Sequence, residues 1–197
     1  MNFLAHLYLS KKNKNILIGN FIADAVKGKR HADYPKEIQA GILLHREIDN
    51  YTDNHPIVRK SKRRLHERYN HYDGVIIDIL YDHFLAKNWN NYSKISLAKY
   101  ADSVYSFLEE NKETFPAKIQ HILPYMIEYN WLVAYASLNG IERILQGMNK
   151  RTKGISKMDL AIEDLKLLYT EFENDFTHFF KELEKFTEEK TTILLAT

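Results

Sequence analysis

The chain has 197 residues, of which 45% are hydrophobic and 27% are charged. These values fit a single globular domain, which we expect to cover residues 1–190, with a frayed tail at 191–197. The sequence has no cysteine, which excludes disulfides and thiolate metal sites. The formal net charge is only +2, which argues against a nucleic-acid-binding protein.

The first apolar run, residues 3–9, is too short to cross a membrane and carries His6 in its middle. No cationic segment precedes it, so the sequence predicts no secretory signal. We therefore expect a cytoplasmic protein that does not associate with membranes.

Helical periodicity dominates the chain, and glycine and proline rarely interrupt it. Asp73 is expected to cap the helix that follows it. The fold class predicted is all-α, a single-domain helical bundle with helices at 2–9, 15–28, 36–54, 57–69, 74–89, 95–112, 118–131, 134–149 and 157–188.

The last predicted helix carries an apolar stripe with three–four spacing. We expect this stripe to close the core, with a dimer seam as the alternative use, so the protein is predicted to be a monomer or a weak homodimer. The stripe comprises Leu165, Leu168, Phe172, Phe176, Phe179, Leu183 and Phe186.

Two chemically reactive side chains lie on the apolar face of the helix predicted at 36–54. Ile38, Ile42 and Ile48 define that face, and His45 and Asp49, four residues apart, fall within it. A carboxylate in apolar surroundings costs several kcal/mol unless it is paired or bound to a cation. This placement therefore predicts a partner or an ion.

The helix predicted at 74–89 is apolar almost all the way round, yet it carries Asp78 and Asp82 one turn apart, with His83 adjacent. Like charges this close repel, and a divalent cation would remove the penalty. Asp24 and His6 lie in two further apolar segments. One such histidine or aspartate is usually a hydrogen-bonded or solvated side chain, but the combination from several helices predicts a metal site.

Oxygen and imidazole ligands without thiolate favour Mn²⁺, Mg²⁺ or Fe²⁺, with Zn²⁺ also possible. A bound divalent ion activates water and stabilises charge on a phosphoryl oxygen, so hydrolysis of a phosphoester is the predicted reaction class. The candidate ligands are Asp24, His45, Asp49, Asp78, Asp82, His83 and, more weakly, His6.

The same residues lie in motifs that resemble the acyl carrier protein phosphodiesterases, a family described as divergent HD-like, all-helical hydrolases. The resemblance covers nearly the whole chain except its last part, and one departure is Ala25, where the family often has an aromatic residue. The motifs are Asn2-Phe3-Leu4-Ala5-His6-Leu7, Gly19-Asn20-Phe21-Ile22-Ala23-Asp24 with Lys27-Gly28, His45-Arg46-x-Ile48-Asp49 with Thr52-Asp53, Asp78-x-x-x-Asp82-His83-Phe84-Leu85 with Trp89, and later Trp131-Leu132, Tyr135 and Gly147-Met148 with Arg151.

The resemblance implies an Mn²⁺-dependent hydrolase that releases 4′-phosphopantetheine from a serine of holo-acyl carrier protein and so gives apo-acyl carrier protein. His45, His83 and Asp82 are the predicted catalytic residues, with His83 or His45 as the proton donor to the leaving serine oxygen. Candidate phosphate-binding residues are Lys27, Arg46 and Arg151.

Two basic clusters are first interpreted as solvated helix faces, and the alternative is a docking patch that attracts an acidic carrier protein. The predicted docking residues are Arg59, Lys60, Lys62, Arg63 and Arg64, and the second cluster is Lys27, Lys29 and Arg30.

Two other functions are compatible with these residues. An HD-like phosphohydrolase could act on a nucleotide or another small phosphoester, because one kind of site serves many substrates. A non-catalytic helical binding protein could instead keep a metal ion only to hold its core together.

Overall fold

The computed structural model describes residues 1–11 and 13–196, and among these it contains helices and no strand, which confirms the predicted all-α class. No helix within these residues is both long and apolar enough to span a bilayer. The α-helices are α1 Phe3–Leu9, α2 Lys14–Ile22, α3 Lys36–Asn54, α4 Pro56–Tyr69, α5 Asp73–Lys87, α6 Leu97–Glu110, α7 Ala117–Glu128, α8 Trp131–Ala134, α9 Leu138–Arg151, α10 Ala161–Leu167 and α11 Tyr169–Ala196.

Several predicted boundaries differ from the structure. The helix expected at 15–28 ends at Ile22. Two 3₁₀ segments follow it, η1 Ala23–Ala25 and η2 Gly28–Asp33. The helix expected at 157–188 is divided into α10 and α11. α11 continues to Ala196, so the frayed tail expected from residue 191 is not what the structure has; Thr197 lies outside the described residues.

Asp73 does not cap α5 from outside, as expected, but is the first residue of that helix. Its carboxylate lies 2.8 Å from Nδ1 of His66 on α4. A side chain from a neighbouring helix therefore occupies the acceptor that a cap would have used.

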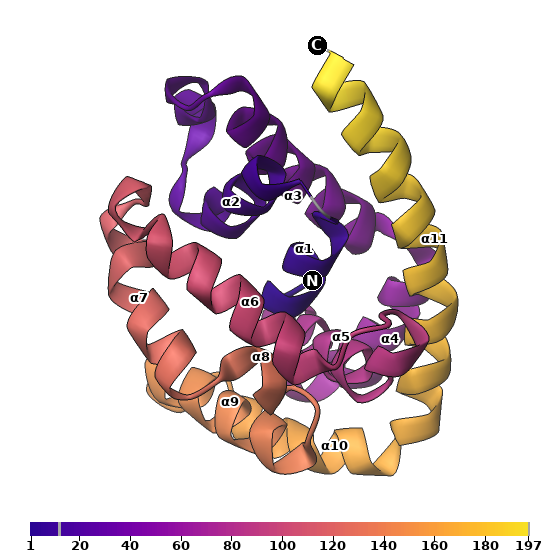
Figure 1. The fold of residues 1–197 in the computed structure, drawn as a ribbon. Coiled ribbons are helices and arrows are strands. Elements are labelled where there is room, and N and C mark those ends of the chain that lie inside the picture. The colour runs from indigo at the N-terminus through magenta and orange to yellow at the C-terminus, as the bar shows by residue number, and fades with distance from the viewer. Residues whose placement is uncertain (12, 197) are drawn as a thin grey trace.

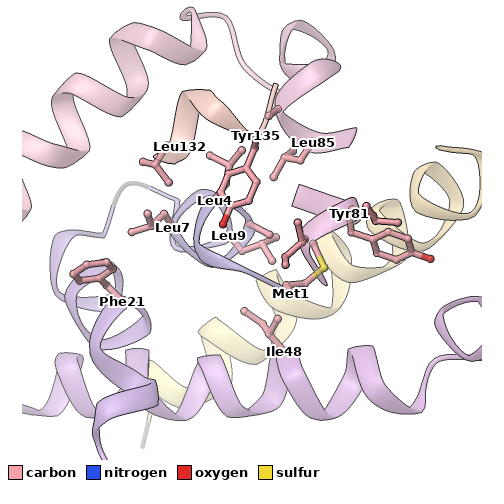
Figure 2. Packing of buried hydrophobic residues seen from close by; sticks show 14 of the residues in the cluster. Met1, Leu4, Leu7, Leu9, Phe21, Ile48, Tyr81, Leu85, Leu132 and Tyr135 are labelled. Carbon is pink, nitrogen blue, oxygen red and sulfur yellow. The ribbon is translucent and has the colours of Figure 1, made fainter. Parts of the chain in front are cut away.

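α1 lies at the centre of the fold, with the other helices around it (Figure 1). It packs against α2 and α5, and Leu4 and Leu7 are fully buried. Figure 2 shows these two side chains among core residues that come from distant parts of the chain, including Phe21, Leu132 and Tyr135. A helix in this position presents the same few residues to several elements, which brings His6 into contact with α2 and α3.

α11 runs along one edge of the molecule (Figure 1) and packs against α3, α4 and α5. Phe172, Phe176, Phe179 and Leu183 are fully buried. The predicted use of the apolar stripe, to close the core, is confirmed.

α2 and α3 cross with their backbones in close contact at two glycines. A Cβ built on Gly19 would lie 2.2 Å from the carbonyl oxygen of Ile38, and a Cβ on Gly41 would lie 2.4 Å from that of Ile16. Neither position has room for a side chain. The crossing brings Asn20, next to Gly19, against His45, one turn after Gly41.

Gly41→Ala is expected to destabilise the protein by about 1–3 kcal/mol, because the added methyl group must force α2 and α3 apart. Gly147→Ala is the matched control, since a Cβ there meets nothing within 4 Å in an exposed part of α9. We expect that control to stabilise by about 0.5–1 kcal/mol. Urea unfolding of both variants measures the difference, and equal stabilities would mean that the crossing is not tight.

Candidate metal centre

Three side chains from α1 and α3 meet at the centre of the candidate site. The imidazole rings of His6 and His45 are stacked, with centroids 3.8 Å apart and planes at 16°. Asp49, one turn after His45, places one carboxylate oxygen 3.1 Å from Nε2 of His6 and the other 3.2 Å from Nε2 of His45. Among the residues that the structure describes, His6, His45 and Asp49 form the group whose possible ligand atoms lie close enough together to hold one ion.

Asp24 reaches the same place from η1. Its Oδ1 lies 3.3 Å from Nε2 of His45, and its side chain is 69% exposed. Arg46 fixes the segment that follows Asp24, because its guanidinium donates to the carbonyl oxygen of Val26 at 2.8 Å. Asp24 therefore forms the solvent side of the cluster.

The cluster opens onto a small cavity of about 30 Å³. Phe3 and Phe21 contribute an apolar wall, and their rings lie 6.1 Å apart. Trp131 packs against Phe3 at 6.0 Å between ring centroids. The residues that line the cavity are Met1, Asn2, Phe3, His6, Asn20, Phe21, Asp24 and His45.

The electrostatics of the cluster keep one histidine charged and the other neutral. Burial lowers the pKa of His45, but hydrogen bonds to Asp24 and Asp49 outweigh burial and raise this pKa to about 9. Burial and the neighbouring positive His45 lower the pKa of His6 to about 4. Although burial alone would raise the pKa of Asp49, its hydrogen bond with the charged His45 ring holds it well below the usual range.

The donor set fits a divalent ion. Ligand atoms about 2.1 Å from an ion and at right angles to each other are about 3 Å apart, which is close to the 3.1 Å and 3.2 Å separations between Asp49 and the two Nε2 atoms. Two imidazole nitrogens with carboxylate oxygens and no sulfur suit Mn²⁺, Fe²⁺ or Zn²⁺. A divalent cation is therefore consistent with this cluster, which leaves the identity of the ion open.

Mn²⁺ affinity is expected to increase with pH, because an ion must displace the proton that His45 holds up to about pH 9. Displacement of one proton gives about a tenfold gain per pH unit below that pKa. Calorimetric titration at about pH 6 and about pH 8, in buffers of different ionisation enthalpy, measures both the affinity and the protons released. An affinity that does not change with pH would mean that the ion does not bind through His45.

The predicted ligands Asp78 and Asp82 on α5 have other partners in the structure. Oδ1 of Asp78 accepts a hydrogen bond from the amino group of Met1 at 2.9 Å. Asp82 is fully buried and accepts from the backbone N–H groups of Asn2 at 3.2 Å, Leu4 at 2.7 Å and Ala5 at 3.4 Å. The structure thus uses Asp82 to hold the start of α1 in place.

His83, predicted as a ligand and a catalytic residue, lies apart from the other two histidines. Its Nδ1 lies 2.7 Å from the carbonyl oxygen of Tyr135, and its Nε2 lies 2.8 Å from the hydroxyl of Tyr169. Both ring nitrogens are therefore occupied, and His83 does not line the cavity. Arg151 likewise lies away from the cavity, near Sδ of Met148 on α9.

Three of the five basic residues predicted on α4 form ion pairs within the molecule. Lys60 and Arg64 both contact the carboxylate of Asp175, which is only 7% exposed. Lys62 contacts Asp53 at 2.6 Å. These pairs attach α4 to α11 and to α3, and they leave less free charge on this face than the sequence indicates.

The remaining basic residues are more accessible. Arg59 and Arg63 on α4 are exposed, and neither forms an ion pair with a described residue. In the basic 27–30 segment, Arg30 forms a long ion pair with Asp33, with 3.8 Å between Nε and Oδ2. That segment begins three residues after Asp24 and exposes Lys27, Lys29 and Arg30.

The sequence reasoning did not single out Asn20 or Phe3 as functional residues. Asn20 is fully buried between the two imidazole rings and the end of α1. A buried polar residue in the apolar run 16–26 was the available signal, because buried polar groups need partners.

Comparison with known proteins agrees with the geometry. The family described as "Acyl carrier protein phosphodiesterase" matches residues 1–183. The chain belongs to this family. This membership confirms the predicted family and the predicted enzyme class, a phosphoric diester hydrolase.

Curated relatives show the same relationship along most of the chain. The acyl carrier protein phosphodiesterase of Yersinia pestis is 37% identical over 155 residues, which are 78% of this chain and 80% of the relative. That of Photorhabdus laumondii is 32% identical over 191 residues, 96% of each chain. That of Serratia proteamaculans is 30% identical over 191 residues, 96% of this chain and 99% of the relative. No solved structure matches the chain.

Proposed function

We propose that this chain hydrolyses the phosphodiester between a serine of holo-acyl carrier protein and 4′-phosphopantetheine, with Mn²⁺ as the physiological ion. The observation that supports the proposal is the convergence of His6, His45 and Asp49 beside a cavity, in a chain of this family. The names of the relatives give acyl carrier protein as what those phosphodiesterases act on.

The Nε2 atoms of His6 and His45 and the carboxylate of Asp49 are the proposed ligands. A divalent ion in this position would lower the pKa of water and stabilise negative charge on a phosphoryl oxygen. The buried amino group of Met1 lies between Asp78, at 2.9 Å, and Asp49, at 3.8 Å. Asp78 therefore holds a positive group beside the cluster.

Asp24 is the proposed proton carrier. In the reaction, an oxygen of water forms a bond to phosphorus, the bond between phosphorus and the serine oxygen breaks, and the serine oxygen gains a proton. With both histidines engaged as ligands, Asp24 is the remaining titratable side chain that lines the cavity. We propose that its exposed carboxylate accepts a proton from water and donates it to the departing serine oxygen.

The apolar wall of the cavity suits the other end of the substrate. Phe3 and Phe21 face the same space as Asp24 and His45. We assign this wall to the part of the pantetheine chain next to the phosphate. We propose that the exposed Lys27, three residues after Asp24, neutralises the phosphate.

Mass spectrometry of holo-acyl carrier protein incubated with the enzyme tests the proposal. Conversion to the apo form with added Mn²⁺, and no conversion after chelation, is the expected result. A nucleotide panel is run in parallel. Turnover of a nucleotide without loss of phosphopantetheine would overturn the proposed substrate, and conversion that survives chelation would overturn the role of the ion.

The carrier is expected to dock on the basic 27–30 segment, because that segment adjoins Asp24 and has few internal ion pairs. Carrier proteins of this kind are acidic, so charge attraction should raise the association rate at low salt. Lys29→Glu combined with Arg30→Glu is expected to lower kcat/KM for holo-carrier by about tenfold or more at low salt and to flatten its salt dependence.

Arg59→Glu combined with Arg63→Glu is the matched control, since it reverses the same charge on α4, the docking surface predicted from the sequence. A small chromogenic phosphodiester is expected to react at the wild-type rate with both double variants. A loss confined to the α4 variant would move the docking surface to α4. Equal losses on both substrates would mean that the site itself is damaged.

A further inference from the structure

The side chain of Asn20 lies between the two histidines and the end of α1, on the side of the rings opposite Asp49. Its Oδ1 is 2.8 Å from Nδ1 of His6 and 3.0 Å from Nδ1 of His45. Asn20 is fully buried, so water does not compete for this oxygen. One amide oxygen therefore faces the corresponding nitrogen of both rings.

The orientation of the Asn20 amide follows from its other partners. Its nitrogen donates to the carbonyl oxygen of His6 at 2.9 Å and to Oγ of Ser10 at 3.1 Å. The Ser10 hydroxyl gives its own hydrogen to the same His6 carbonyl at 2.8 Å, so its oxygen must act as an acceptor towards Asn20. Both groups beside the amide nitrogen are acceptors, and the oxygen must point towards the imidazoles.

An oxygen in that place can only accept, so it favours a hydrogen on each Nδ1. In a neutral imidazole, a hydrogen on Nδ1 leaves the lone pair on Nε2. The two Nε2 atoms are the ones that face Asp49. For the hydrogen of His6, Asn20 Oδ1 at 2.8 Å is closer than the competing Asp49 Oδ1 at 3.1 Å. Histidines that bind metals commonly donate their second ring N–H to such a partner, which fixes the ring and its tautomer.

We propose that Asn20 is a positioning residue that fixes the Nδ1–H tautomer of His6 and the orientation of both rings, so that their Nε2 atoms are available to a divalent cation. This inference shares with the proposed function only the assumption that a divalent ion binds at the cluster. The two histidines differ in their dependence on Asn20. Nδ1 of His45 also lies 2.9 Å from the backbone carbonyl oxygen of Asn20, which any substitution retains, whereas His6 has the side chain alone.

The test compares Asn20→Leu, which has similar size and no acceptor, with Asn20→Asp, which keeps an acceptor oxygen. Two-bond ¹⁵N–¹H NMR spectra of the metal-free protein near neutral pH report which ring nitrogen carries the hydrogen. His6→Gln and His45→Gln spectra assign the signals. In Asn20→Leu, His6 is expected to lose the Nδ1–H pattern while His45 keeps its own, and Asn20→Asp is expected to retain both patterns.

Mn²⁺ affinity, measured by calorimetry, is the second readout. Loss of such a supporting hydrogen bond typically weakens metal binding about 10–100-fold, which is expected for Asn20→Leu and not for Asn20→Asp. Ser10→Ala is the control for a change in local packing, since it leaves Oδ1 of Asn20 in place and is expected to leave the His6 pattern unchanged.

Retention of the Nδ1–H pattern of His6 in Asn20→Leu, in a variant that is folded by circular dichroism, would overturn the inference. Loss of the pattern in Ser10→Ala as well would also overturn it, because general loosening would then be the cause. The NMR result does not depend on turnover. Failure to cleave holo-carrier would therefore refute the proposed function and leave the role of Asn20 standing.

Discussion

Asp49→Asn is expected to reduce turnover by at least about 1,000-fold and Mn²⁺ affinity by at least about 100-fold, while the protein stays folded. The carboxylate contacts Nε2 of both histidines, and the amide that replaces it removes the negative charge from the centre of the cluster. The amide also places an N–H₂ group where an ion would bind. Calorimetry with Mn²⁺ and the holo-carrier assay measure the two effects.

Asp53→Asn is the matched control for this variant. It makes the same change one turn further along α3, where the carboxylate is exposed and pairs with Lys62. We expect turnover and Mn²⁺ affinity to stay near the wild-type values. Wild-type turnover in Asp49→Asn would remove Asp49 from the site, and equal losses in both variants would point to damage to α3.

Asp82→Ala is expected to lower the free energy of unfolding by about 3–5 kcal/mol, because buried backbone N–H groups of α1 lose their acceptor. Thermal and urea unfolding measure the loss. Activity should fall as well, since α1 carries His6. Added Mn²⁺ is expected to restore only part of the stability, because the ion cannot supply an acceptor to Leu4. A variant as stable as the wild type would show that Asp82 does not hold α1.

We expect the Asp82 carboxylate to make the free energy of unfolding depend on pH, and we expect Asp82→Asn to remove this dependence. Burial raises the pKa of Asp82 to about 7, above the ordinary value of 3.8. Between these values the folded state holds a proton that the unfolded state has lost, so this residue lowers stability as pH rises from about 4 to about 7. The difference in unfolding free energy between wild type and Asp82→Asn is expected to change in that window and to be flat above it.

Periodicity alone singled out two of the residues that the structure brings together. His45 and Asp49 lie on the apolar face of α3, and one turn of helix separates them, so the sequence could place both at one point. The same argument also predicted ligands at Asp78 and Asp82, for which the structure shows other partners. Like charges one turn apart indicated a cation, whereas the structure relieves them with the amino group of Met1 and with backbone N–H groups of α1. Helical spacing records which face a residue occupies and not which distant group lies opposite.

Other features depended on contacts between helices that no local pattern describes. The division between α10 and α11 at Leu168 involves neither glycine nor proline. Each part packs on a different partner: α10 lies against α9, and α11 against α3. Asn20 was missed for a related reason, because its two imidazole partners come from α1 and α3, on either side of it in the chain.

The bond between Asp82 and the start of α1 has a consequence for the order of folding during synthesis. α1 has seven residues, too few to form a stable helix by itself in water. It leaves the ribosome before α5, and the carboxylate that caps it is made about 80 residues later, at roughly 5–20 residues per second. His6 therefore reaches its place only after α5 has emerged, and a truncated nascent chain that ends before Asp82 would hold α2 and α3 without an assembled metal centre.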